Sequence, residues 1–236
     1  MTPTYNERAN IDEFLLQLRN AVPDADIFVV DDSSPDETAA RVTEHAAHDP
    51  KVHLISRQGP RGYAAASREG LRLIAASGYD VVVTLDCDLS HDPRTIPLMI
   101  EAVGMGADVV VGSRYIAGGG VRNWSLFRRV LSRCGNWYTA LMLGVGVKDC
   151  TSGFRAYRAE IIRSGAITAT TSSGYAFLTE VLLRVRQNQT YSVVEVPIIY
   201  TDRTAGSSKM SSSIVVESMQ RVTWWGVRRL MGRAVR

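Results

Sequence analysis

The chain contains, at residues 79 to 93, the stretch YDVVVTLDCDLSHDP. It starts as an unbroken apolar run rich in β-branched residues and stops on two aspartates one residue apart, Asp86 and Asp88. A strand that is apolar at every position, rather than at every second one, is covered on both faces of its sheet. The stretch therefore predicts a buried strand of an α/β protein, with two carboxylates at its carboxyl end.

Similar apolar runs recur along the first half of the chain. Strands are predicted over residues 26–32, 51–56, 79–86 and 107–112, and helices over 36–48, 61–77 and 94–103. This alternation predicts a mostly parallel, Rossmann-like sheet with helices on both faces. The second half is predicted to contain a Gly-rich turn at 117–120, helices over about 124–143 and 174–188, a strand over 191–200 and a last helix from about 211.

The composition is globular, with 45% hydrophobic and 22% charged residues among 236, a length at which one domain is expected. The net charge of +3 comes from residues 203–236, which hold seven Lys or Arg residues and one Glu, and we expect no nucleic-acid partner. No run approaches the roughly 18 to 20 apolar residues of a membrane span, and no signal peptide is indicated. Three cysteines without metal-ligand spacing, Cys87, Cys134 and Cys150, favour buried, reduced thiols in a cytoplasmic protein.

Acidic residues follow two of the predicted strands: Asp31 and Asp32 after the first, and Asp86 and Asp88 after the third. In open α/β sheets, ligands bind outside these carboxyl ends. Two carboxylates that converge on one spot repel each other, and Mg2+ or Mn2+ with bound phosphate oxygens would relieve the repulsion. The pair therefore predicts a metal ion and a nucleotide diphosphate. A haloacid-dehalogenase-type phosphatase stays open as an alternative, although such enzymes usually carry their Asp-x-Asp pair in an early strand.

Six motifs, in order along the chain, resemble one known family. They are PTYNE (3–7), VDDSSPDET (30–38), DCDLSHDP (86–93), GSRY (112–115), TSGFRAYR (151–158) and EVPIIYTDRTAGSSKM (195–210). Together they are similar to family-two glycosyltransferases, and most closely to the branch that makes dolichol- or polyprenol-phosphate mannose. The resemblance implies a GT-A fold and a catalytic domain over residues 1–210.

An enzyme of this branch transfers mannose, with inversion at the anomeric carbon, from GDP-mannose to polyprenol or dolichol phosphate. By position, the resemblance implies that the nucleotide sugar is bound by Pro3, Tyr5, Glu7, Val30, Asp32, Asp86, Cys87, Asp88, Arg114, Arg203 and Lys209. It implies that the metal is held by Asp86, Asp88 and Ser90, and that the catalytic residues are Asp86, Asp88 and Arg114. It implies that the acceptor phosphate meets Arg114, Arg128, Ser132 and Arg203.

Physical chemistry supports some of these roles independently. Arg128 and Ser132 lie four residues apart on a predicted helix and so share a face, where a guanidinium can grip phosphate oxygens; an ordinary solvated helix face is the alternative. Lys209 lies in a Gly/Ser-rich loop that could close over a diphosphate. A phosphate monoester already carries about −1.5 to −2 charge at neutral pH, so no general base is required. His91 is accordingly predicted to have a structural role in its turn and no catalytic role.

Residues 211–236 are predicted to form a C-terminal amphipathic basic helix. One side gathers Val216, Met219, Trp224, Val227, Leu230 and Met231, and the other gathers Arg221, Arg228, Arg229 and Arg236. Such a helix can lie among lipid headgroups, which predicts peripheral association with the cytoplasmic face of a membrane. The alternatives are packing against its own domain or against an integral-membrane partner protein.

Two alternatives for the activity stay open at this point. A UDP-glucose-dependent polyprenyl-phosphate glucosyltransferase would share these motifs, because pocket contacts that motifs do not resolve select the nucleotide and sugar. A non-catalytic nucleotide-binding module for a membrane partner is the alternative from another class. One departure from the family pattern keeps it open: only Met1 and Thr2 precede PTYNE, where the family has a core strand. Either the start is truncated, or the sheet lacks that strand.

Overall fold

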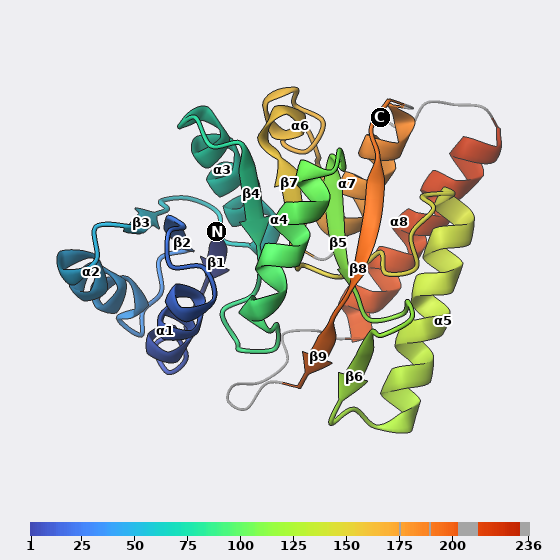
Figure 1. The fold of residues 1–236 in the computed structure, drawn as a ribbon. Coiled ribbons are helices and arrows are strands. Elements are labelled where there is room, and N and C mark those ends of the chain that lie inside the picture. The colour runs from blue at the N-terminus through green and yellow to red at the C-terminus, as the bar shows by residue number, and fades with distance from the viewer. Residues whose placement is uncertain (175, 189, 203–211, 232–236) are drawn as a thin grey trace.

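The computed structural model describes residues 1–174, 176–188, 190–202 and 212–231, which form an α/β fold (Figure 1). The strands are β1 (Thr2–Thr4), β2 (Ile27–Asp31), β3 (Val52–Ser56), β4 (Val81–Thr84), β5 (Val109–Ser113), β6 (Gly120–Arg122), β7 (Arg155–Arg158), β8 (Val193–Pro197) and β9 (Ile199–Thr201). The helices are α1 (Ile11–Ala21), α2 (Thr38–His48), α3 (Tyr63–Ala76), the 3-10 turn η1 (Pro93–Thr95), α4 (Ile96–Gly104), α5 (Leu126–Leu143), α6 (Ala159–Arg163), α7 (Ala176–Gln187) and α8 (Ser212–Leu230). The strands and helices predicted for the first half are all present.

The central sheet has two hydrogen-bonded parts. β1, β2 and β3 are parallel and lie in that order, and the second part has the order β4-β7-β5-β8. Two main-chain bonds join the parts: the Met1 nitrogen donates to Val83 O at 2.8 Å, and the Leu85 nitrogen donates to Met1 O at 3.3 Å. Of the two alternatives drawn from the short segment before PTYNE, the missing strand is wrong, because β1 pairs with β2 at this place in the sheet.

One strand of the sheet, β7, was not predicted from the sequence. It lies antiparallel between β4 and β5, whereas β5 and β8 are parallel. Its first residue, Arg155, is fully buried, and its guanidinium donates to the carbonyls of Ser152, Leu178 and Cys150 at 2.8 to 3.0 Å. An arginine is almost never fully buried unless its donors are satisfied. The sequence of this segment, RAYR, therefore does not have the apolar pattern of a central strand.

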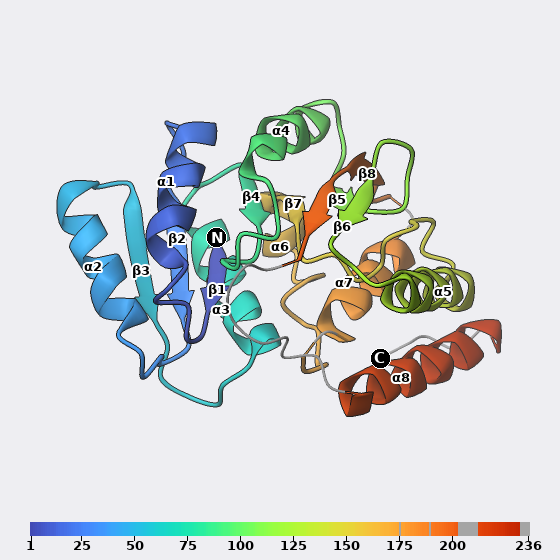
Figure 2. The same cartoon turned by 90° about the horizontal axis from the view of Figure 1, so that it is seen from below.

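Alternate residues of the central strands reach opposite faces of the sheet. Val109 and Val111 of β5 lie in the core on one face, and Val110 lies in the core on the other. Helices α3, α6, α7 and α8 contribute to the first core, and α1, α2 and α4 contribute to the second (Figures 1 and 2). The strands are apolar throughout because both faces are covered.

The strand predicted over 191–200 is divided next to Pro197, which has no N–H for a sheet. β8 continues the main sheet, whereas β9 pairs in parallel with β6 outside it. Of the cysteines, Cys87 and Cys150 are buried as expected, but Cys134 on α5 is exposed, contrary to expectation.

Helix α8 packs beside α5 and α7 at one end of the molecule (Figure 2). Its Val222 and Trp225 are 3% and 4% exposed, so the helix packs against its own domain. Five of the six residues of the predicted apolar side nevertheless stay exposed: Val216, Trp224, Val227, Leu230 and Met231. A membrane span is not found among the helices of the described residues.

Candidate functional site

A pocket of about 300 Å³ opens at the carboxyl ends of β1, β2 and β4. It is lined by Pro3, Thr4, Tyr5, Glu7, Asp32, Arg61, Gly62, Tyr63, Ala66, Asp86, Cys87, Asp88 and Gly174. Seven of these residues are among those that the sequence assigned to a nucleotide sugar: Pro3, Tyr5, Glu7, Asp32, Asp86, Cys87 and Asp88. The sheet therefore brings three separate motifs into one cavity. Val30 is not part of the lining; it is fully buried and lies against Gly70 in the core.

One wall of the pocket holds Asp32 through donors that the sequence analysis did not identify. The carboxylate pairs with the buried Arg57 guanidinium, and its Oδ2 accepts from the Gly62 nitrogen at 2.5 Å. Gly62 has a φ of 151° and directly precedes α3. Arg61 lies 5.0 Å from the centroid of the Tyr5 ring and donates to its hydroxyl at 2.9 Å. The Gly-containing stretch RQGPRGY before a helix is typical of anion-binding loops and could have identified this wall.

The opposite wall is the loop after β4, which carries Asp86 and Asp88. Asp88 is only 4% exposed, and its Oδ1 accepts from the nitrogen and the hydroxyl of Ser90 at 3.1 and 2.5 Å. Leu89 has a left-handed φ of 61°, an uncommon conformation for a non-glycine residue. Ser90 therefore orients Asp88 in a tightly turned loop.

His91 supports this loop from beneath. It is buried between the rings of Phe154 and Tyr200, with centroids 5.1 and 5.4 Å away. Its Nδ1 accepts from the Asp86 nitrogen at 3.3 Å. Burial lowers the pKa of His91 to about 4, so the ring is neutral at neutral pH and carries its proton on Nε2. His91 thus does more than complete a turn, because it holds the main chain at Asp86.

Gly153, in the TSGF segment, lets two pocket residues approach. A Cβ atom at this position would lie 2.8 Å from the Tyr63 hydroxyl and 3.4 Å from Asp86 Oδ1. The first distance is too short for a side chain, so only glycine leaves Tyr63 and Asp86 where they are.

The acidic pair fits a divalent cation that shares its coordination with a substrate. No group of three or more His, Cys, Asp or Glu side chains forms a metal site within the described residues. Mg2+ is usually bound through one or two carboxylates together with substrate phosphates and water. Asp86 and Asp88, with the Ser90 hydroxyl beside them, match that donor set.

Arg114 lies outside the pocket lining, in a buried ion pair. Its Nε and Nη2 donate to the two carboxylate oxygens of Asp149, both at 2.7 Å, and Nη2 also donates to Thr151 Oγ1 at 2.8 Å. The side chains of Arg114 and Asp149 are 9% and 0% exposed. Burial opposes ionisation of Asp149, but the guanidinium holds the pKa of that carboxyl below its usual value. Asp149 therefore stays ionised and fixes the direction of Arg114.

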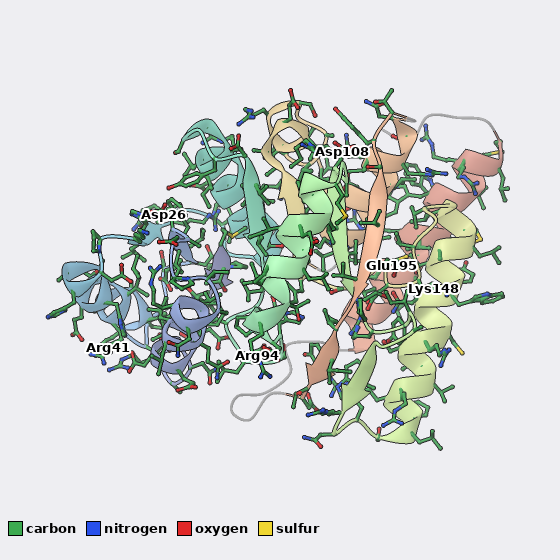
Figure 3. All side chains as sticks on the ribbon, viewed as in Figure 1. Asp26, Arg41, Arg94, Asp108, Lys148 and Glu195 are labelled. Atoms are coloured by element: carbon green, nitrogen blue, oxygen red, sulfur yellow. The ribbon has the colours of Figure 1, made fainter. Side chains whose placement is uncertain are left out.

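Strand β8 and helix α5 hold the turn that carries Asp149. The carboxylate oxygens of Glu195 accept from the nitrogens of Lys148 and Asp149 at 2.9 and 3.0 Å, and Figure 3 shows Lys148 and Glu195 side by side. Asn136 Oδ1 accepts from the Cys150 nitrogen at 2.8 Å. The EVP motif thus supports Arg114 through the turn at 148–150.

The residues predicted to meet the acceptor phosphate gather near the start of α5. The guanidinium carbons of Arg114 and Arg128 lie 5.6 and 4.1 Å from the ring centroid of Trp124. Ser132 Oγ lies 2.6 Å from the Tyr115 hydroxyl. The structure therefore brings Arg114, Arg128 and Ser132 into one basic, aromatic cluster, which also includes Trp124 and Tyr115.

Two predicted residues, Arg203 and Lys209, lie outside the described residues. Sequence reasoning missed Asp149 and Asp202, which pair with Arg114 and Arg128. Asp149 lies in a turn, and Asp202 directly follows β9, so a strand end did mark Asp202. The arginine partner of each carboxylate is distant in the sequence, so no local pattern could have found the two ion pairs.

A model of glycosyl transferase family 2 matches residues 1–165. The chain belongs to this family. The family-two glycosyltransferase is 44% identical over 233 residues to the polyprenol monophosphomannose synthase of Mycolicibacterium smegmatis, covering 98% of this chain and 88% of that one. It is 42% identical over 225 residues to the undecaprenyl-phosphate mannosyltransferase of Micrococcus luteus, with coverages of 95% and 92%. The resemblance read from the motifs is confirmed.

Solved structures confirm the GT-A fold of this glycosyltransferase. Glucosyl-3-phosphoglycerate synthase from Mycobacterium tuberculosis, in complex with Mn2+, UDP and glucosyl-3-phosphoglycerate, superposes with a TM-score of 0.66 at 19% identity. The match covers 99% of this chain and 79% of the other. At this identity the likeness concerns the fold alone.

Proposed function

We propose that this glycosyltransferase transfers mannose from GDP-mannose to a polyprenol monophosphate, giving polyprenol-phosphate mannose and GDP. The names of the relatives support the sugar and the acceptor. The observation that carries the proposal is the placement of the acidic pocket beside the basic, aromatic cluster. His91 under the acidic loop contacts the Tyr200 ring, which lies 5.5 Å from the Trp124 ring of the cluster. Two anionic substrates can thus meet between the two.

The proposed reaction needs no proton transfer. An oxygen of the acceptor phosphate attacks the anomeric carbon, the bond from that carbon to the diphosphate oxygen breaks, and its electron pair leaves with GDP. The acceptor oxygen is already ionised at neutral pH, and attack opposite the leaving group inverts the anomeric carbon. The site must therefore align two anions and offset their repulsion.

The chain's own residues divide this work between them. Tyr5, Asp32 and Arg61 would bind the nucleoside end of the donor, and Asp86, Asp88 and Ser90 would hold Mg2+ or Mn2+ at its diphosphate. Such an ion supplies positive charge for the leaving group. Arg114, Arg128 and Ser132 would bind and orient the acceptor phosphate. We assign Arg203 to the phosphates and Lys209 to the donor, on the family resemblance alone.

A transfer assay tests this function. The protein is incubated with MnCl2, farnesyl phosphate and radiolabelled GDP-mannose or UDP-glucose, and label is counted in the organic phase. We expect label from GDP-mannose. Label from UDP-glucose alone would indicate a glucosyltransferase instead. No label from either donor, with nucleotide still bound, would indicate a non-catalytic nucleotide-binding module.

The proposal extends to a membrane surface, where a polyprenol acceptor resides. The outer side of α5 exposes an apolar stripe whose members are Leu126, Phe127, Val130, Leu131, Trp137 and Leu141, between 52% and 78% exposed. Helix α8, which also has exposed apolar residues, packs beside α5 (Figure 2). The exposed Arg129 and Arg133 of the same helix would meet anionic headgroups. Stripe and arginines together are the pattern of a helix that lies in a membrane interface.

The α5 stripe, rather than the tail as a whole, is the surface to test, because removal of α8 would uncover Trp225 and the core. We expect the double variant Phe127→Ser/Trp137→Ser to bind vesicles of phosphatidylglycerol about tenfold or more weakly, since each large apolar side chain contributes about 1.5 to 3 kcal/mol when buried. Cosedimentation measures this. The matched control is Leu98→Ser on α4, which removes a side chain that is 45% exposed and should leave binding unchanged. Equal sedimentation of all variants would contradict the assignment.

A further inference from the structure

The ion pair between Arg128 and Asp202 occupies part of the cluster assigned to the acceptor phosphate. Arg128 Nη1 lies 2.7 Å from Asp202 Oδ2, and the guanidinium stacks on the Trp124 ring. The two side chains are 35% and 31% exposed. A carboxylate of the protein therefore already uses one of the donors that an incoming anion would need.

Arg128 differs in this respect from its neighbour Arg114. The partner of Arg114, Asp149, is completely buried and receives further bonds from the main chain. The partner of Arg128 is about a third exposed, and water can solvate its carboxylate once the pair separates. The ion pair of Arg128 is thus the exchangeable one of the two.

The main chain beneath Asp202 is anchored independently of this ion pair. The Thr201 nitrogen donates to Ser90 O at 3.1 Å, and the Asp202 nitrogen donates to Arg122 O at 3.4 Å. Rotation of the Asp202 side chain can therefore free Arg128 while β9 stays in place. The first of these bonds also connects the end of β9 to the acidic loop.

We propose that Asp202 is a specificity-determining residue that competes with the acceptor phosphate for Arg128, an inference that rests on the proposed function. A phosphate monoester carries about −1.5 to −2 charge and three acceptor oxygens, and it can displace a single carboxylate from a guanidinium. A neutral hydroxyl has no charge with which to do so. Asp202 thus favours strongly anionic acceptors over neutral ones. When no acceptor is bound, Asp202 pairs with Arg128.

The test is Asp202→Asn, assayed with farnesyl phosphate as acceptor. Loss of the competing charge should lower the KM for farnesyl phosphate about threefold to tenfold, with little change in kcat, because a pair that is about a third exposed and one like-charge contact are removed. The matched control is Asp49→Asn, which removes an ion pair with Arg19 of the same 2.7 Å length and similar exposure, 26% and 32%. That pair lies beyond α2, at the other end of the molecule (Figure 1), and KM should not change.

A structural role for Asp202 would give the opposite result, a raised KM or a lowered kcat in Asp202→Asn, and that result or an unchanged KM would overturn the proposal. A double-mutant cycle sharpens the test: in an Arg128→Ala background, Asp202→Asn should no longer lower KM. Calorimetric titration with inorganic phosphate needs no transfer. Tighter phosphate binding by Asp202→Asn is expected even if the donor assignment fails, and equal binding would count against Asp202 itself.

Discussion

Asp88→Asn is expected to lower kcat for mannosyl transfer about 10²- to 10³-fold, because a bound cation is worth several kcal/mol to the departing diphosphate. Asparagine keeps the shape of the side chain and the acceptor for Ser90, whose hydroxyl lies 2.5 Å from Asp88 Oδ1. It removes the charge that would hold the metal ion. The measurement is transfer from labelled GDP-mannose at saturating MnCl2.

A second readout separates metal binding from folding. Mn2+ binding in the presence of GDP, followed by electron paramagnetic resonance, should weaken in Asp88→Asn while the thermal unfolding curve stays close to that of the wild type. The control is Asp92→Asn in the same loop, whose carboxylate is 39% exposed and paired with Arg94; it should retain activity. Near-native turnover by Asp88→Asn would remove the metal role from this residue.

Asp149→Asn is expected to lower the free energy of unfolding by about 3 to 5 kcal/mol, the usual result of leaving one member of a buried ion pair without its partner. Arg114 would keep its charge in a place where its side chain is only 9% exposed. Urea unfolding measures the difference. Asp49→Asn, which breaks an equally short but partly exposed pair, should cost no more than about 1 kcal/mol.

The pH dependence gives a further check on Asp149. The folded state holds the pKa of this carboxyl below its usual value, so its stabilising effect is complete above the unfolded pKa of about 4 and is lost as the pH falls through the folded value. The stability gap between wild type and Asp149→Asn should therefore persist from pH 5 to pH 8 on this account, and shrink only in stronger acid. A gap that closed near neutral pH would contradict it.

Much of the fold could be predicted because both faces of the sheet are buried. Strands such as β4 and β5 are continuous apolar runs, and those runs are visible without a structure. Helix α1 was missed although Ile11, Phe14 and Leu18 are buried at helical spacing, so that signal was present. β7 could not be predicted, because the carbonyls that satisfy its buried Arg155 come from other parts of the chain.

The pocket was predictable for a similar reason, and its neighbours were not. Tyr5, Asp32 and Asp88 each follow a strand, and strands of one parallel sheet end at a common edge. Arg57 and Arg61, which pair with Asp32 and Tyr5, were missed although the stretch RQGPRGY before α3 marked their loop; what the sequence does not show is which residue each arginine pairs with. The assignment of Val30 to the pocket was not supported, since its side chain points into the core.

By itself, the amino-acid sequence determined most strands of the sheet, most of its helices, and the acidic residues at the strand ends, because burial on two faces and strand termination are local properties that leave local patterns. Only the tertiary structure decided which ion pairs are buried in the protein and which are exposed enough for a ligand to displace the carboxylate. Asp149 and Asp202 are both carboxylates paired with arginines at 2.7 Å. Asp149 is buried, whereas Asp202 is partly exposed to water. The strength of an ion pair depends on that difference in solvation. No local sequence pattern shows it.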